Sequence, residues 1–238
     1  MSERESWLRS FHAANPGVTS RAFARGGSYE RLAARIPADA RVLELACGDG
    51  ALLRLLGARA VGLDLSYEEI VRGSDSRPRV QARALALPFA DGTFAAVTCH
   101  LAFMLFDHVE AVVNELHRVL EAGGSFHALL GGGPTAEGDD AFHAFAAMLP
   151  KQGRAFGDRR ASSEAGWREL FDASRWRDIR FERWVLDLSG TFDQVWTFLG
   201  SSYQLEDADR VKQALRERYP IDPVPLSIAT YYASVIRR

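Results

Sequence analysis

Short apolar runs alternate with helical patterns along most of the chain. Continuous apolar runs are typical of strands that a parallel sheet buries on both faces. Alternation of such strands with helices predicts an α/β fold with a mostly parallel sheet. We expect strands at residues 41–46, 60–64, 80–83, 94–99, 126–130, 179–188 and 226–236.

Apolar residues at helical spacing predict helices between these strands. Ser66 followed by Glu69 has the form of a capping box. Asp107 is a good helix cap, and Gly123-Gly124 is a typical helix stop. A helical leader is expected over residues 1–36. The other expected helices cover residues 50–57, 66–72, 107–121, 139–148, 162–171, 191–203 and 205–219.

The end of the first predicted strand carries the pattern Glu-x-x-x-Gly-x-Gly, from Glu44 to Gly50. The two glycines permit a sharp turn and a close approach of a ligand to the backbone. A following helix would direct unpaired N–H groups at that ligand. A dinucleotide fingerprint needs a third glycine where this chain has Leu53, and a P-loop needs a Lys that is missing here. The motif alone leaves a plain strand-to-helix turn open as the alternative to a ligand site.

Composition and charge narrow the class of protein. Apolar residues make up 47% of the chain, and a net charge of −2 with a pI near 6.3 gives no basic footprint for nucleic acid. No run of about 18 apolar residues predicts a membrane span, and the charged start of the chain is unlike a secretory signal. We therefore expect a cytoplasmic protein with no nucleic-acid or membrane partner.

Two cysteines, Cys47 and Cys99, lie at the ends of predicted parallel strands. We expect them to be reduced, buried and side by side. No His/Cys cluster of metal-ligand spacing accompanies them. We therefore expect no metal, and a disulfide or a two-ligand metal site is the less favoured alternative.

Four segments follow one another in a characteristic order. They are the glycine motif Val42–Gly50, the apolar run ending in an acid at Val61–Ser66, the segment Ala84–Phe94, and the turn segment Leu116–Gly124. Their order and separation resemble the class I S-adenosylmethionine-dependent methyltransferases, specifically the small-molecule, type 11-like methyltransferase domain. The resemblance covers residues 40–131.

This resemblance implies a fold and a division of the chain. The fold would be α/β, with a Rossmann-like, seven-stranded, mostly parallel sheet, helices on both faces and an antiparallel last strand. We expect a single methyltransferase domain over residues 1–238. Within it, residues 1–36 would form a helical lid and residues 40–131 the cofactor-binding core. Helical insertions at residues 134–176 and 190–220 would form the substrate side.

The resemblance also implies S-adenosylmethionine as the cofactor. The Gly48–Gly50 turn would receive its methionine portion, Asp64 its ribose hydroxyls, and Leu65 would pack on adenine. We expect the cofactor-binding residues to be Tyr29, Glu44, Ala46, Gly48, Gly50, Asp64, Leu65, Ala84, Leu85, His100 and Leu101.

Arg83 departs from the family pattern. Many members carry an acid there, whose carboxylate accepts a hydrogen bond from the adenine amino group. A guanidinium cannot accept that bond. Either the affinity for adenine is lower, or Arg83 points outward and backbone groups of Ala84 and Leu85 hold the base.

His100 is the candidate catalytic residue, because it follows the fourth strand at the edge where ligands bind in open α/β sheets. A contact to cofactor or substrate, a general base and a structural role are all open for it. The candidate substrate-side residues are Trp7, Phe11, Met104, Trp196 and Tyr203, for which core packing is the alternative.

These observations predict transfer of a methyl group from S-adenosylmethionine to an O, N or C atom of a small apolar or aromatic molecule. The alternative is a nucleotide- or S-adenosylmethionine-binding α/β protein that does not transfer methyl groups, and Arg83 supports that alternative. A dehydrogenase is disfavoured by the missing third glycine. The sequence identifies neither the methyl acceptor nor the oligomeric state.

Overall fold

The structure is a computed structural model of the chain and describes residues 10–11, 13–73, 75–135, 138–149, 157–203 and 205–238. The predicted leader residues Trp7 and His12 lie outside the described residues. Within the described ranges, no helix combines the length and the apolar character that crossing a membrane requires.

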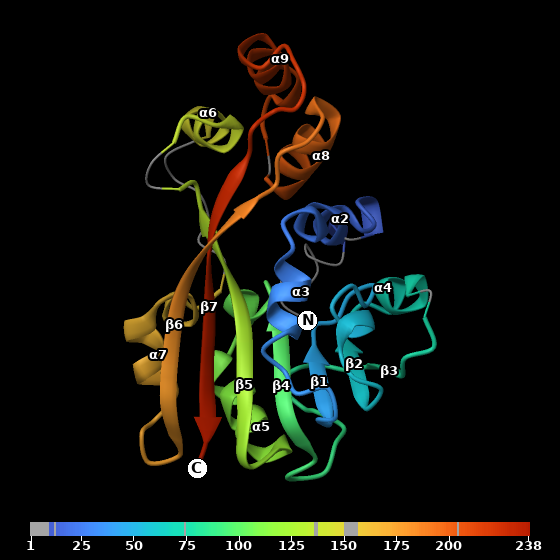
Figure 1. Cartoon of the computed structure of the whole chain (residues 1–238), viewed down its shortest axis with the longest axis vertical. Helices are drawn as coiled ribbons and strands as arrows, with labels where there is room; N and C mark the ends of the chain where they lie inside the picture. The colour runs from blue at the N-terminus through green and yellow to red at the C-terminus, as the bar shows by residue number, and fades with distance from the viewer. Residues whose placement is uncertain (1–9, 12, 74, 136–137, 150–156, 204) are drawn as a thin grey trace. The chain divides into compact units, whose positions relative to one another are not determined.

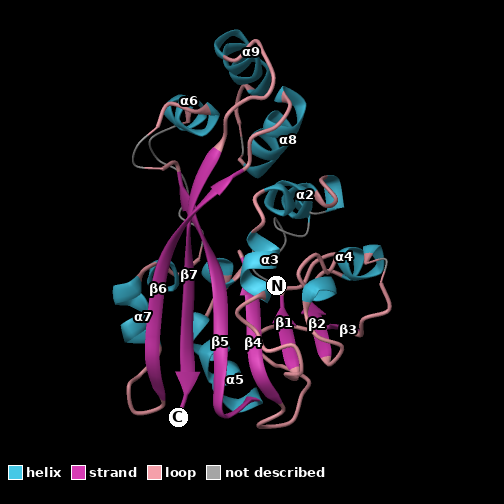
Figure 2. Cartoon of the chain, viewed as in Figure 1, coloured by secondary structure: helices cyan, strands magenta, loops and turns pink. Residues whose placement is uncertain are grey.

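The strands of the described residues form a seven-stranded sheet in the order β3-β2-β1-β4-β5-β7-β6 (Figure 1). β1 pairs in parallel with β2 and β4, β2 with β3, and β4 with β5. β7 runs antiparallel to its neighbours (Figure 2). The predicted Rossmann-like sheet with an antiparallel last strand is therefore confirmed. The strands are β1 Val42–Leu45, β2 Ala60–Asp64, β3 Arg79–Gln81, β4 Phe94–His100, β5 Leu120–Gly133, β6 Trp176–Asp187 and β7 Ser227–Arg237.

Successive residues of a strand point to opposite faces of the sheet, and helices cover both faces. Phe126 and Tyr231 pack in the core that also contains helices α5 (Val109–Val119) and α7 (Glu164–Leu170). Their neighbours His127 and Tyr232 bond to each other across the opposite face, with 2.8 Å between Nδ1 and the hydroxyl. Arg35, just after helix α3 (Ser28–Ala33), lies 4.8 Å from the Tyr232 ring.

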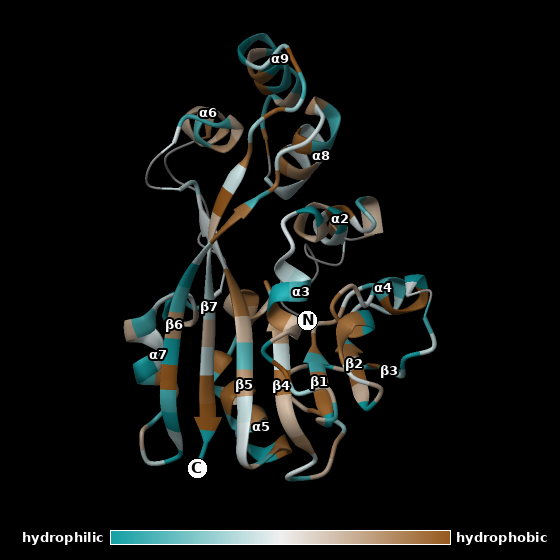
Figure 3. Cartoon of the chain, viewed as in Figure 1, coloured by the Kyte–Doolittle hydropathy of each residue, from teal (hydrophilic) through white to brown (hydrophobic). Residues whose placement is uncertain are grey.

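The core on the α5 side is rich in aromatic residues. Trp167 stacks on Phe126, with ring centroids 5.7 Å apart, and its indole N–H donates to the Ala161 carbonyl at 2.9 Å. Phe171 and Phe103 complete the cluster. β1 and β4 are mainly hydrophobic, whereas β6 mixes hydrophilic and hydrophobic residues (Figure 3). This matches the less buried face predicted for the sixth strand.

The chain divides into two compact units. Unit 1 comprises Met1–Ser28, Gly132–Arg154 and Val185–Thr230, and unit 2 comprises Tyr29–Gly131, Ala155–Trp184 and Tyr231–Arg238. Unit 2 contains most of the sheet. Unit 1 contains helices α2 (Val18–Arg25), α6 (Ala141–Met148), α8 (Phe192–Ser202) and α9 (Ala208–Arg218), which pack against one another. The prediction of a single domain with a lid and insertions stays a prediction.

The helix predicted at residues 50–57 does not form. The segment after the glycine motif contains only a 3-10 helix, Leu53–Leu55. The chain turns at Gly57, where a Cβ would lie 1.9 Å from the Ala38 carbonyl oxygen, and β2 begins at Ala60. Tertiary packing therefore ends the segment before an α-helix is established.

The fifth strand is longer than predicted, and the preceding helix is shorter. α5 begins at Val109, because His108 takes a φ of 53° as its N-cap, so Asp107 is not the cap. Gly123-Gly124 does not stop the helix, because β5 already starts at Leu120. The register with β4 shifts between Phe94, which pairs with Leu120, and Ala96, which pairs with Ser125, so the strand is irregular around these glycines.

Candidate functional site

The predicted glycine turn follows β1 directly. The Cys47 N–H donates to the Leu63 carbonyl of β2 at 2.9 Å, and the Gly50 N–H closes the turn on the Cys47 carbonyl at 2.8 Å. Gly48 and Gly50 have φ values of 52° and 79°. Glycine adopts such left-handed conformations without a steric penalty, so these two positions need it.

Asp64 holds this turn against the end of β2. One carboxylate oxygen accepts from the Gly48 N–H at 2.7 Å, and the other accepts from the Ser66 N–H at 2.8 Å. Both oxygens of this carboxylate therefore accept from backbone groups, one in the turn and one just after β2. Ser66 also caps helix α4 (Tyr67–Arg72) by accepting from the Glu69 N–H, as predicted, but the Glu69 carboxylate pairs with Arg72.

Glu44 on β1 is a buried acid with an open acceptor. Its side chain is 2% exposed, and its Oε2 has no hydrogen-bond partner among the described residues. Burial raises its pKa well above the usual value, and the nearby carboxylates of Asp64 and Asp49 raise it further. A buried polar atom without a partner is costly, so this oxygen fits a hydrogen-bond donor of a bound ligand.

Tyr29 and His100, two of the predicted cofactor-binding residues, lie side by side in unit 2. Their rings stack with centroids 4.1 Å apart and an interplanar angle of 27°. Tyr29 comes from α3, and His100 ends β4. Burial raises the pKa of Tyr29, and the carboxylates of Asp49 and Glu44 raise it further. The phenol therefore lies near the glycine turn.

Burial lowers the pKa of His100 to about 3. The imidazole is 9% exposed and therefore neutral at physiological pH. A general base works best when its pKa lies near the working pH. This environment favours a contact through the neutral ring over proton abstraction.

Two other predicted cofactor residues adopt unusual backbone conformations. Ala46 and Leu101 both have a φ of 57°, and they follow the carboxyl ends of β1 and β4. Non-glycine residues in this region are strained, and such strain is frequent at ligand sites. Leu65, Ala84 and Leu85 are half-buried.

Arg83 is exposed to solvent. Of the two predicted alternatives, the structure supports the outward-pointing side chain. Ala84 and Leu85 pack against the hydrophobic core of unit 2, which leaves their backbone as the candidate contact for adenine.

The sequence motif containing Arg118 has a structural role that the residues alone did not reveal. Its guanidinium donates to the carbonyls of Phe89 and Leu87 at 2.6 and 2.9 Å and to the Asp91 carboxylate at 2.9 Å. Glu115 pairs with Arg118 and accepts from the Leu87 N–H at 2.7 Å. This network holds the loop that follows Ala84 and Leu85. The sequence did contain one signal for this network, because Asp91 and Arg118 lie in two separate family motifs and carry opposite charges.

The cysteines are free and buried, as expected. Burial raises the pKa of Cys99 to about 12 and also raises that of Cys47. Neither thiol is therefore an activated nucleophile.

The predicted substrate-side residues are distributed over both units. Met104 lies in unit 2 in the 3-10 helix Phe103–Leu105 and is half-buried. Phe11, Trp196 and Tyr203 belong to unit 1, and Trp7 lies outside the described residues. Tyr203 packs on Phe142 and Phe145, with ring centroids 6.3 and 5.1 Å apart. Packing within unit 1 thus accounts for Tyr203, and a role in substrate binding stays a prediction.

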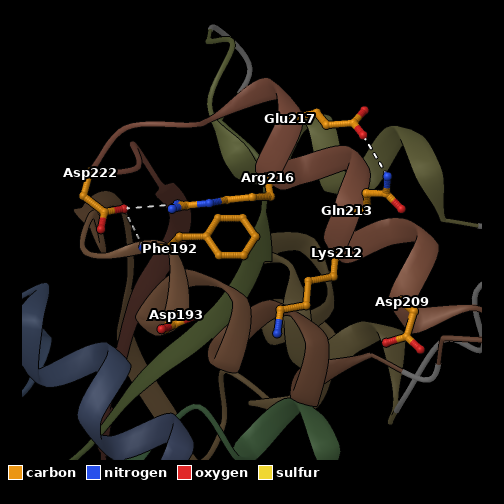
Figure 4. A pocket seen from close by; sticks show the side chains of 8 residues that line it. All are labelled: Phe192, Asp193, Asp209, Lys212, Gln213, Arg216, Glu217 and Asp222. Atoms are coloured by element: carbon orange, nitrogen blue, oxygen red, sulfur yellow. Dashed lines mark hydrogen bonds and ion pairs between the residues drawn. The ribbon is translucent and has the colours of Figure 1, made fainter.

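A groove of about 450 Å³ lies elsewhere, on α8 and α9 of unit 1 (Figure 4). It contains no predicted site residue. Arg216 and Gln213 pair with acids there, Asp222 at 3.8 Å and Glu217 at 2.9 Å. The groove is lined mainly by exposed polar and charged side chains. The lining residues are Phe192, Asp193, Asp209, Lys212, Gln213, Arg216, Glu217 and Asp222.

Comparison with known proteins shows which family model and which relatives this chain resembles. Residues 43–128 match the family model described as a methyltransferase domain. The demethylmenaquinone methyltransferase of Thermus thermophilus is 40% identical over 100 residues, which cover 37% of this chain and 45% of that protein. The ubiquinone/menaquinone biosynthesis C-methyltransferase UbiE of Xylella fastidiosa is 32% identical over 160 residues, covering 60% and 61%.

Among solved structures, the YcgJ protein of Bacillus subtilis superimposes with a TM-score of 0.58 at 20% identity. The superposition covers 91% of this chain and 98% of that one, and it shows a shared fold. The chain spans less than half the length of each of the first curated relatives it matches.

Proposed function

We propose that this chain, whose residues 43–128 match the methyltransferase domain, is a class I S-adenosylmethionine-dependent methyltransferase that transfers a methyl group from S-adenosylmethionine to an O, N or C atom of a small apolar molecule. The observation that carries the proposal is the glycine turn, held by Asp64 and bordered by the open carboxyl oxygen of Glu44. The alternative without methyl transfer is not favoured, because the matched relatives are named methyltransferases.

The residues at the turn fit this cofactor. Gly48 and Gly50 let the backbone approach the methionine portion, and Glu44 can accept a hydrogen bond from its ammonium group. Asp64 would accept hydrogen bonds from the ribose hydroxyls. Bound S-adenosylmethionine would supply an activated methyl group on its sulfonium. The protein then has to hold the acceptor in line and exclude water.

The other cofactor contacts are part of the same proposal. Leu65, Ala84 and Leu85 would border adenine, and their partial burial supports an apolar contact. Tyr29, Ala46, His100 and Leu101 would lie on the methionine side, near the turn. We propose that His100 acts as a neutral contact and that no protonated imidazole is needed, since its pKa is depressed by burial.

The acceptor is proposed from its chemistry. The relatives are named for menaquinone and ubiquinone biosynthesis, which supports an apolar ring compound. Met104, Trp196, Tyr203, Phe11 and Trp7 remain the proposed substrate side, with residues 1–36, 134–176 and 190–220 as the segments that carry most of it. A cytoplasmic location and the absence of a nucleic-acid partner also stay predictions.

Two measurements test the proposal. Calorimetric titration should show binding of S-adenosylhomocysteine and none of NAD. Incubation with S-adenosylmethionine and a panel of quinone precursors and other apolar ring compounds should give a product heavier by one methyl group in mass spectrometry. Binding without any methylated product across the panel would support the non-methylating alternative, and binding of NAD alone would overturn the family-based function.

A further inference from the structure

Carbonyls of the β1–β2 connection accept hydrogen bonds from arginine side chains. The Arg77 guanidinium donates to the carbonyls of Leu56, at 2.8 Å, and Gly57. The Asp49 carbonyl, inside the glycine turn, accepts from Arg54 at 3.0 Å and from Arg79 at 3.5 Å. A helix over residues 50–57 would pair the Asp49 carbonyl with a backbone N–H of its first turn, whereas the Leu56 and Gly57 carbonyls would lie at its unpaired C-terminal end. Arginine side chains donate to all three carbonyls, and the Gly57 carbonyl also accepts from the Ala60 N–H at 3.1 Å.

Unlike Arg54, Arg79 has a deeply buried side chain. Its side chain is 5% exposed, and its Nη2 pairs with the Asp75 carboxylate at 2.6 Å. Its Nη1 lies 3.5 Å from the Asp75 and Arg77 carbonyls, and its Nε has no partner among the described residues. A buried charge is retained only when its surroundings compensate it. Asp75 compensates one side of this guanidinium.

On its other side Arg79 meets the glycine turn, where its Nη2 lies 3.5 Å from the Asp49 carbonyl oxygen. The positive charge of Arg79 works against the rise in the pKa of Glu44, which burial and the carboxylates of Asp64 and Asp49 cause. It acts in the same direction on the Cys47 thiol. Arg79 is thus the buried cation that faces the acids at the proposed methionine site.

The Arg79 guanidinium fills the space beside two glycines. A Cβ added to Gly50 would lie 2.2 Å from Nη2 of Arg79, and one added to Gly73 would lie 2.4 Å from its Cζ. Gly73 has a φ of −58°, which any residue adopts. Only the space taken by Arg79 therefore requires glycine at position 73. The side chain is fixed between the turn and the end of α4.

We propose that Arg79 is a positioning residue for the methionine portion of the cofactor, because it holds the Gly48–Gly50 turn where no α-helix follows and balances the acids beside it. This inference rests on the proposed function, since it assumes that S-adenosylmethionine binds at the turn. It assigns to the third strand a role that no sequence motif indicated. Arg77, two residues earlier, bonds only outside the turn and is the matched control.

The test compares two ligands that share adenosine. S-adenosylhomocysteine carries the amino-acid portion, and 5′-methylthioadenosine does not. Calorimetry on Arg79→Met should show about 10- to 100-fold weaker binding of S-adenosylhomocysteine, the loss expected for a charge-assisted hydrogen bond. Binding of methylthioadenosine should change by less than about threefold. Arg79→Lys should give an intermediate loss of affinity, because it keeps the positive charge but lacks the planar guanidinium with its several N–H donors. Arg77→Met should leave the ratio of the two affinities unchanged.

A double-mutant cycle of protein stability, measured without ligand, tests whether Arg79 lies against Gly73. Gly73→Ala should lower the melting temperature of the otherwise unchanged protein and have no further effect in Arg79→Met, because the clash disappears with the guanidinium. Equal cost of Gly73→Ala in both backgrounds would overturn the placement of Arg79. Unchanged affinity of Arg79→Met for S-adenosylhomocysteine, or equal loss for both ligands, would overturn its positioning role. If the unsubstituted protein binds neither ligand, the proposed function itself fails.

Discussion

Unit 2 and unit 1 hold their candidate site residues in different ways. In unit 2, polar side chains of the motifs bind backbone groups of other motifs. Asp64 accepts from Gly48, and Arg118 donates to the carbonyls of Leu87 and Phe89. Each bond has a defined direction and fixes a loop that faces the proposed cofactor site.

In unit 1, the candidate residues are held by ring packing. Tyr203 contacts Phe142 and Phe145, and Phe23 meets Phe198 edge to face at 5.6 Å. Apolar packing tolerates exchange of one apolar residue for another. The comparison teaches that directed polar bonds specify a ligand site from few residues, whereas an aromatic stripe specifies a packed interface and leaves its ligand undefined.

The largest expected effect follows from removing Arg118. Among the described residues, Arg118→Ala removes the only side-chain donor to the Phe89 carbonyl. It also removes one of the donors to the Leu87 carbonyl and to the Glu115 carboxylate, which keep the Phe89 and Leu87 N–H groups, respectively. We expect the free energy of unfolding to fall by about 2–4 kcal/mol in urea titrations. Arg168→Ala is the control, because its pair with Glu164 is exposed on both sides and should be worth less than about 0.5 kcal/mol. Equal losses for the two variants would contradict the bracing role of Arg118.

Cofactor binding to an Asp64 variant tests whether the directed polar bonds of unit 2 form a ligand site. Asp64→Ala removes the acceptor of the Gly48 N–H and the proposed acceptor of the ribose hydroxyls. We expect S-adenosylhomocysteine to bind about 1–3 kcal/mol more weakly in calorimetry. Asp193→Ala removes one carboxylate from unit 1 and controls for net charge. Unchanged affinity of Asp64→Ala would remove Asp64 from the cofactor site.

The contributions of His127 in unit 2 and His143 in unit 1 to the free energy of unfolding should depend on pH in opposite directions. In unit 2, burial lowers the pKa of His127 to about 4. The unfolded chain then binds more protons below about pH 6.5, so stability falls as the pH drops from 6.5 to 4, by up to about 1.4 kcal/mol per pH unit. His127→Gln should flatten this part of the profile, measured as the urea midpoint against pH.

His143 in unit 1 has the reverse sign. The hydrogen bonds to Asp140 (2.8 Å) and to the Thr135 carbonyl (2.6 Å) raise its pKa. Its stabilising contribution is complete below the unfolded pKa and is lost as the pH rises through the folded value. His143→Gln should therefore reduce stability at pH 6 more than at pH 8. If His127→Gln and His143→Gln changed the pH dependence of the urea midpoint in the same direction, the opposite pKa shifts of the two histidines would be contradicted.

The smallest effect is expected from Tyr203. Tyr203→Leu keeps an apolar side chain and loses the ring contacts to Phe142 and Phe145, so the free energy of unfolding should fall by about 1 kcal/mol. Binding of S-adenosylhomocysteine should change by less than about twofold in calorimetry. A large loss of cofactor affinity would show that the difference between the units is less sharp than the contacts indicate.

Much of unit 2 could be predicted from the sequence, because its signals are local. Periodicity gave the strands, and a strand buried on both faces has few other arrangements. The turn at Gly48 and Gly50 needed residues that tolerate positive φ, and the chain shows them directly. Family motifs added the acid at Asp64. The outward position of Arg83 was one of two stated alternatives.

The errors arose where distant segments compete for the same backbone. Residues 50–57 have helical spacing, but the close approach of Ala38 to Gly57 and the Arg77 bonds end the segment at a 3-10 turn. Gly123-Gly124 has the form of a helix stop, but pairing with β4 draws it into a strand. Local propensity is weak compared with such tertiary contacts.

By itself, the sequence determined the α/β class, the approximate positions of the strands apart from the start of β5, and the glycine turn, since each depends on periodicity or on the backbone freedom of single residues. Only the tertiary structure decided that the Tyr29 ring stacks on His100, that Arg118 braces the loop after Leu85, and that Arg79 is buried beside the turn. Those contacts join segments far apart in the chain, and burial and hydrogen bonding across such distances leave no periodic signal in the residues that make them.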